Sequence, residues 1–344
     1  MIIKLDKEDK KRILKLIEEQ NMNICAADDL FNYCFYSSGK HINDHVSAIK
    51  DYLDLDLSDK ENKYYFDSRI GPAFKHLDNA DYDNNFYRKN IKPKPFKTKE
   101  YQLTYLTFGT NQCFPYDDID IKDNYVEVSR IGYFPNDFQY LAVMKDDVVW
   151  MSTDPNEINT MQDSIDEAHG KVVALGLGLG YFPIMTATKD EVSEVVVVEK
   201  DQTIINIFKQ HILPLFNKCE KIKIVHADAF DYIKNINCDY LFIDIWHNPE
   251  DGLPLYIRFK NELKNKSFKA SYWLEKSILA MLRRCVITLV EENLEGYNDN
   301  NYQKAKNEYD EIINRLYFKT KDMVISSFED LIKILQDKEL KKLV

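Results

Sequence analysis

The stretch that decides the fold is VVALGLGLGYFP, residues 172–183. An apolar run leads into Gly176, Gly178 and Gly180, and we expect a helix directly after them. Glycine lets the backbone turn sharply and lie against a ligand, because it has no Cβ. The start of the helix adds free amide donors and the positive end of a helix dipole. The pattern predicts a strand–loop–helix unit that holds a ligand against the backbone.

Further short apolar runs follow this unit at intervals long enough for crossover helices. The predicted strands are KVVALGL (171–177), EVVVVEK (194–200), KIKIVHA (221–227) and CDYLFID (238–244). Such runs are typical of parallel strands that are buried on both faces. Alternating strands and helices indicate an α/β fold with a Rossmann-like, doubly wound, mainly parallel sheet.

Two acidic residues stand at the ends of the strands that follow the glycines. Glu199 ends the second strand, where a carboxylate can accept hydrogen bonds from both hydroxyls of a ribose. Asp228 ends the third strand and could accept from an adenine amino group, while the Ala229 amide could donate to the ring. The sequence therefore predicts an adenosine-containing ligand.

Two adenosine cofactors use such a crevice, and the residue at position 181 separates them. A dinucleotide fingerprint, G-x-G-x-x-G, needs a small residue there, but the chain has Tyr181, which would obstruct a pyrophosphate. S-adenosylmethionine (SAM) has no phosphate, so the motif favours SAM over NAD. The expected cofactor contacts are Gly176, Leu177, Gly178, Gly180, Tyr181, Glu199, Lys200, Asp228, Ala229 and Asp244.

The ordered segments GLGLG, VVVVEKD, HADAF and CDYLFIDIW resemble the successive motifs of class I SAM-dependent methyltransferases, over about residues 165–260. The layout is most similar to the spermidine synthase-like branch, because a β unit precedes the glycines and an Asp followed by a Pro ends the fourth strand. The resemblance implies the class I methyltransferase fold and group transfer from SAM.

The chain departs from the spermidine synthase pattern at two places. Leu179 stands where those enzymes usually carry an Asp. The segment from Asp244 to Pro249 is one residue longer than Asp-x-x-Asp-Pro and has Asn248 before the proline, so the second acidic group is missing. These departures favour methyl transfer over aminopropyl transfer from decarboxylated SAM. A SAM-binding module without activity is the third reading.

The acceptor is expected beside the segment IDIWHNPEDG (243–252). Asp244 could orient the SAM amino group or take a proton from the acceptor. Trp246 could stack on a flat acceptor or pack against the edge of the sheet. His247 could serve as a general base or be solvated, and methyl transfer often needs no base. Both readings of Trp246 and of His247 stay open.

The composition narrows the class of partner. The 344 residues carry a formal net charge of −11, which argues against nucleic acid and anionic membranes as partners. There is no apolar run of 18 residues, the first 20 residues lack a signal-peptide core, and no two of the six cysteines are spaced as C-x-x-C. We expect a cytoplasmic enzyme with a small-molecule acceptor, and a homodimer stays open. His41 and His45 would share a helix face, but without a third ligand they predict no metal site.

Four regions are expected along the chain. Residues 1–100 should be mostly helical, with a first helix at 7–20 and a Lys/Pro linker at 88–99. Residues 101–155 should form a small antiparallel β unit, with a hairpin turn at Lys145-Asp146-Asp147. The SAM-binding domain should span 156–295, where 271–297 is one helix or a helix and a strand. Helices near 302–316 and 327–341, the second starting at Ser327, should fill 296–344.

Overall fold

The computed structural model describes residues 1–302 and 304–344. Its largest sheet has five strands among these residues, all parallel, in the order β13-β12-β11-β14-β15. The strands are β11 (Gly170–Leu175), β12 (Val192–Glu199), β13 (Ile222–His226), β14 (Tyr240–Ile243) and β15 (Lys269–Tyr272). The four predicted strands are confirmed, and β15 is an addition.

The strand order reverses at β11, which pairs with β12 on one side and β14 on the other. Ligands of open α/β sheets bind at the carboxyl ends of the strands beside such a reversal. The loop 176–180 begins where β11 ends and leads into α7 (Tyr181–Ala187), the helix expected after the glycines. The fold therefore puts this loop at the position where a crevice is expected.

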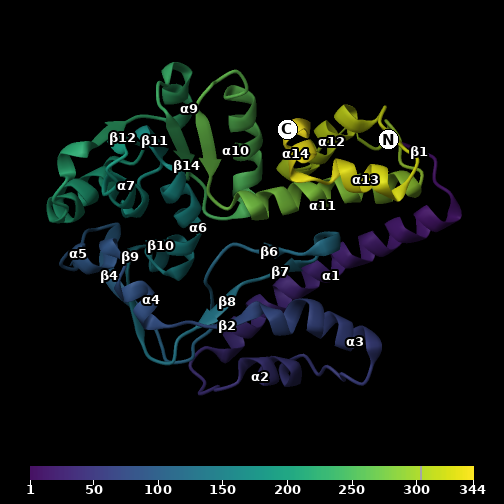
Figure 1. Cartoon of the computed structure of the whole chain (residues 1–344), viewed down its shortest axis with the longest axis horizontal. Helices are drawn as coiled ribbons and strands as arrows, with labels where there is room; N and C mark the ends of the chain where they lie inside the picture. Colours follow the sequence, from purple (N-terminus) through teal and green to yellow (C-terminus); the bar gives the residue numbers. More distant parts are fainter. Residues whose placement is uncertain (303) are drawn as a thin grey trace.

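Crossover helices connect the parallel strands. They are α7, α8 (Gln202–Ile207), α9 (Ala229–Tyr232) and α10 (Pro249–Glu262), and α6 (Pro155–Glu167) precedes β11. Right-handed crossovers put α7 and α8 on one face of the sheet and α10 on the other. This arrangement agrees with the doubly wound, Rossmann-like sheet expected from the sequence (Figure 1).

The region before the sheet is helical but more extensively packed than expected. It contains α1 (Lys7–Ser37), α2 (His45–Tyr52), α3 (Lys60–Tyr65), α4 (Asn79–Asp83) and α5 (Phe86–Asn90). The expectation that the first helix ends near residue 20 is wrong, because α1 continues to Ser37. Near its middle, α1 buries the polar residues Glu19 and Asn23, which pair with the buried Arg69, so apolar periodicity does not reveal that the helix continues.

The expected antiparallel unit is a four-stranded sheet in the order β10-β9-β4-β3. Its strands are β3 (Phe96–Lys97), β4 (Tyr101–Phe108), β9 (Phe138–Lys145) and β10 (Val148–Ser152). The predicted hairpin turn is confirmed, since Lys145 pairs with Val148 across Asp146 and Asp147. The linker expected at 88–99 is not a free loop: Ile91 and Pro93 are buried, and β3 pairs with β4.

Short strands tie distant parts of the chain together. β2 (Phe74–His76) pairs with β8 (Ile131–Tyr133), which also pairs with β5 (Phe114–Pro115), and β6 (Asp120–Ile121) pairs with β7 (Glu127–Val128). β1 (Ile2–Ile3) pairs with β16 (Val324–Ile325), so both ends of the chain lie at one side of the molecule (Figure 1).

The C-terminal region begins with one long helix. α11 (Glu275–Leu294) shows that 271–297 contains a single helix, with β15 before it and no strand at CVITLV. The helices α12 (Glu308–Thr320), α13 (Phe328–Ile334) and α14 (Asp337–Leu343) follow. Ser327 caps α13 together with Asp330, as expected, but the helix expected over 327–341 is divided in two. No helix among residues 1–302 and 304–344 is long and apolar enough to cross a membrane.

Candidate active site

The three glycines of the loop have positive φ angles of 99°, 51° and 75°, at Gly176, Gly178 and Gly180 respectively. A Cβ at Gly176 would collide with the carbonyl oxygen of Asp244, and one at Gly180 would collide with the ring of Phe208. Around Gly178, in contrast, the nearest heavy atom would be the Met151 sulfur at 3.9 Å. Gly176 and Gly180 are thus needed for packing, whereas Gly178 leaves open space over the loop.

Glu199 lies against this loop at the end of β12. One carboxylate oxygen accepts from the Leu177 amide at 3.1 Å, and the other accepts from the Asp201 amide at 2.7 Å. Each oxygen still has a lone pair that could accept from a hydroxyl. The side chain is half-buried and the adjacent Lys200 is exposed. Glu199 is therefore fixed beside the glycine loop with capacity left for two further hydrogen bonds.

Asp228 and Ala229 stand at the end of the neighbouring strand β13. One oxygen of Asp228 caps α9 by accepting from the amides of Phe230 and Asp231, at 2.8 and 3.3 Å. The Ala229 amide is the first of that helix, a position without an intrahelical acceptor. An acceptor and a donor thus sit side by side, which is the pair that an adenine edge requires.

Asp244 is the carboxylate at the end of β14. Burial, followed by the negative charge of Glu199, raises the pKa of the Asp244 carboxyl to about 7. Glu157, in the first turn of α6, joins the same group: burial, followed by the charges of Asp244 and Asp154, raises the pKa of its carboxyl well above the ordinary value. Carboxylates in such a group repel one another, so a cation bound among them would be stabilised.

The structure corrects the role expected for Trp246. Its side chain is buried, its indole N–H donates to the Trp273 carbonyl at 3.2 Å, and it packs on Gly252. Trp246 is therefore a packing residue at the sheet edge and cannot stack on an acceptor. Asn248 caps α10 in a reciprocal pair with Asp251, which explains why a proline follows it at Pro249.

His247 stays available to a ligand. About half of its side chain is exposed, its backbone amide donates to the Asp251 carboxylate, and its ring Nδ1 lies 3.3 Å from the same carboxylate, which leaves Nε2 for a ligand. Its ring lies 4.5 Å from the ring of Trp150 on β10, measured between centroids. Sequence reasoning missed Trp150, Met151 and Glu157, because all three lie outside the motifs. The Asp-Pro-x-Glu start of α6 was the only local signal for Glu157.

Two further expectations change. The Tyr181 side chain is buried beside Tyr87 and its hydroxyl accepts from Asn85, so only its backbone remains for a cofactor. His41 and His45 do not share a helix face, because α2 begins at His45. His45 is buried between Tyr33 and the Asn111 carbonyl, while His41 is exposed.

Comparison with known proteins gives partial similarities. No protein-family profile and no curated protein matches the chain. Among solved structures, TrmK of M. capricolum with S-adenosylhomocysteine is 19% identical, covering 33% of this chain and 48% of its own, with a TM-score of 0.26. Spermidine synthase of Thermotoga maritima is 16% identical, covering 45% and 59%, with a TM-score of 0.30.

A third structure, the complex of DhpI with SAM and HEP, is 16% identical, covering 29% of this chain and 44% of its own, with a TM-score of 0.23. The chain thus spans about half of the length of each of these structures. The assignment of the fold rests on the strand order and the loop of the chain itself.

Proposed function

We propose that this chain binds SAM at the loop 176–180 and transfers its methyl group to a small-molecule acceptor. The observation that carries the proposal is the convergence of Gly178, Glu199, Asp228 and Asp244 at the carboxyl ends of four adjacent strands. In this reading Glu199 accepts from the ribose, and Asp228 with the Ala229 amide binds the adenine. SAM would supply an activated methyl group on a sulfonium.

The chain's own residues would then align the acceptor and exclude water. The partly exposed rings of Trp150 and His247 contact each other, and Met151, the next residue along β10, lies over Gly178. Asp244 can hold an ammonium group or receive a proton from the acceptor, because a carboxylate with a pKa near 7 exchanges protons near neutral pH. Glu157 beside it favours an acceptor that carries positive charge, such as an amine.

The same carboxylates support a second candidate, aminopropyl transfer from decarboxylated SAM. The missing acidic residue before Pro249 argued against it, but Glu157 supplies an acidic group near Asp244 from another element. SAM carries a carboxylate of its own, whereas decarboxylated SAM is a dication. Close carboxylates attract a dication more strongly.

The product released distinguishes these functions. The chain should be incubated with SAM, or with decarboxylated SAM, and a panel of amines, phenols and nucleosides. We expect S-adenosylhomocysteine from SAM. Release of methylthioadenosine from decarboxylated SAM alone would replace our proposal with the second candidate. SAM binding with neither product, over the whole panel, would favour a binding module without activity.

Asp244→Asn gives the matched test, because it keeps the shape and removes the charge. We expect its turnover to fall by about a hundredfold with a smaller change in SAM affinity. Asp231→Asn, an exposed carboxylate paired with Lys234, should keep the parent rate. An Asp244→Asn variant that runs at the parent rate would contradict the assigned role.

A further inference from the structure

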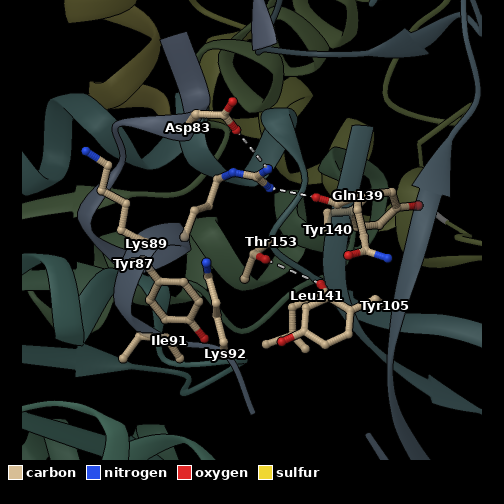
Figure 2. Close-up of a pocket in the computed structure, with 11 residues that line it drawn as sticks. Asp83, Tyr87, Lys89, Ile91, Lys92, Tyr105, Gln139, Tyr140, Leu141 and Thr153 are labelled. Carbon is tan, nitrogen blue, oxygen red and sulfur yellow. Dashed lines mark hydrogen bonds and ion pairs between the residues drawn. The ribbon is translucent and has the colours of Figure 1, made fainter. Parts of the chain in front are cut away.

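A separate cavity of about 450 Å³ lies between α5, the chain after it and the strands β4 and β9. Its walls include the buried side chains of Tyr87, Leu141 and Thr153, together with Tyr105 (Figure 2). Cavities of this size hold small organic molecules. None of the residues expected to bind SAM lines it.

Positive charge is concentrated in this cavity although the chain is acidic. Three of its lining residues are cationic, Arg88, Lys89 and Lys92, against one carboxylate, Asp83. Such an excess of cations over anions around a partly open cavity attracts a negatively charged ligand.

The Arg88 guanidinium has hydrogen-bonding capacity to spare. It donates from Nη1 to the Gln139 carbonyl at 2.9 Å, and its Nη2 is 3.8 Å from the Asp83 carboxylate, too far for a hydrogen bond. Its buried Nε–H has no partner within residues 1–302 and 304–344. A guanidinium binds carboxylate and phosphate oxygens through two donors at once, so Arg88 can take an anion without first losing a strong ion pair.

The two lysines differ in direction. Lys89 points out of the group of lining side chains and donates to the Asn84 side chain at 2.9 Å (Figure 2). Lys92 extends toward Thr153 (Figure 2). Within the described part of the chain, its ammonium makes no hydrogen bond or ion pair. Arg88 and Lys92 therefore supply the positive charge of the cavity, and the ammonium of the third lining cation, Lys89, is turned away from it.

Aromatic surface completes the cavity and connects it with the glycine loop. The rings of Tyr87 and Tyr105 line the wall, and the hydroxyl of Tyr105 donates to the Pro93 carbonyl at 3.1 Å. The Tyr87 hydroxyl donates to the Leu179 carbonyl at 2.6 Å. Such walls suit a flat or apolar body next to the charged group.

From this arrangement we infer that the cavity is a second small-molecule site, for a ligand with a carboxylate or phosphate group on a compact apolar body. Arg88 and Lys92 bind the anionic group, and Tyr87 and Tyr105 contact the body. The inference stands independently of SAM binding, because it uses none of the same residues. Since Tyr87 also holds Leu179, a ligand here is placed to influence the loop.

Titration calorimetry with three probes of similar size tests the inference. Phenyl phosphate, benzoate and neutral benzyl alcohol should be added to the full chain without SAM. We expect saturable binding of at least one anion and none of benzyl alcohol. Whether phenyl phosphate or benzoate binds identifies the preferred anion. No saturable binding of either anion up to about 10 mM, a very weak interaction, would overturn the inference.

Variants locate the binding. Lys92→Gln removes an exposed charge and should lower the affinity for the anion by about fivefold. Arg88→Gln should lower it by about tenfold or more. Lys89→Gln, the matched control, should change the affinity by less than about twofold. If Arg88→Gln unfolds the chain, the comparison of Lys92→Gln with Lys89→Gln still tests whether the anion binds in this cavity. Equal affinity in the parent and in Lys92→Gln would overturn the inference.

Discussion

Single carboxylates decide the chemistry of the candidate site. Glu199 ends β12 and Asp244 ends β14, the two strands that flank β11, and burial, followed by the negative charge of Glu199, raises the pKa of Asp244 to about 7. The sequence predicted both residues from their position at strand ends. It could not predict Glu157, because the electrostatic interaction of Glu157 with Asp244 depends on where the fold places α6.

The raised pKa of Asp244 predicts that SAM affinity depends on pH. A bound cation favours the ionised carboxylate, so binding releases the proton that Asp244 holds below its pKa. Affinity should therefore weaken as the pH falls, by about tenfold between pH 8 and pH 6. Calorimetry at both pH values measures this. Asp244→Asn should show a clearly shallower profile, which keeps only the contribution of Glu157, and an equal slope in parent and variant would assign the proton to another group.

Substitution of Gly178 should abolish SAM binding while the chain still folds. Gly178→Val places a branched side chain, at a φ of 51°, in the open space over the loop. SAM affinity should fall beyond detection, by more than about a hundredfold. Gly39→Val is the control, because Gly39 has a φ of 74° with nothing within 4 Å of a Cβ. It meets similar backbone strain and should bind SAM like the parent.

At the scale of the elements, the sequence predicted those strands and turns whose formation depends on their own residues. Short runs of apolar residues indicated β11, β12, β13 and β14, and the residues at the turn indicated the β9–β10 hairpin. β15 was missed because Ala270 and Ser271 at its centre are neither large nor branched, and it forms by pairing with β14. The run CVITLV is part of the helix α11 and not a strand, because its buried residues continue the buried face of that helix.

The β9–β10 turn carries a prediction of its own. Asp146 and Asp147 have φ angles of 50° and 62°, the left-handed conformation that a two-residue hairpin turn needs. Glycine adopts this conformation at lower cost than aspartate. Asp147→Gly should therefore raise the free energy of unfolding by about 0.5–1 kcal/mol, measured by urea denaturation. A lower midpoint for this variant would contradict the assigned turn.

At the scale of the whole molecule, the N-terminal region supports the loop from outside. Tyr87 donates to the Leu179 carbonyl, Asn85 donates to the Tyr181 hydroxyl, and Tyr101 donates to Asp201 beside Glu199. No motif in the sequence pointed to these contacts, because they join residues about a hundred positions apart. The boundaries expected at 100, 155 and 295 stay predictions.

Because Tyr87 holds the Leu179 carbonyl, a substitution at Tyr87 should change SAM binding although Tyr87 is not one of the expected SAM contacts. Tyr87→Phe removes a buried hydroxyl and leaves the Leu179 carbonyl unpaired, at a cost of about 1–3 kcal/mol in stability. Because Leu179 belongs to the loop, SAM affinity should also weaken several-fold. Tyr105→Phe is the control, because the Tyr105 hydroxyl donates to the Pro93 carbonyl, away from the loop. This variant should keep the parent affinity for SAM. Equal SAM affinities in both variants would show that Tyr87 acts on stability alone.

The central claim is that the loop 176–180 and Glu199 form a SAM site. The most direct test is titration calorimetry of SAM into the full chain at pH 8, with Glu199→Ala as the variant. We predict saturable binding at one site per chain. Glu199→Ala, checked for folding by circular dichroism, should lose about 1–3 kcal/mol of binding free energy, because it removes a charged hydrogen-bond acceptor. No binding of SAM to the folded parent, or unchanged affinity in a folded Glu199→Ala variant, would contradict the account.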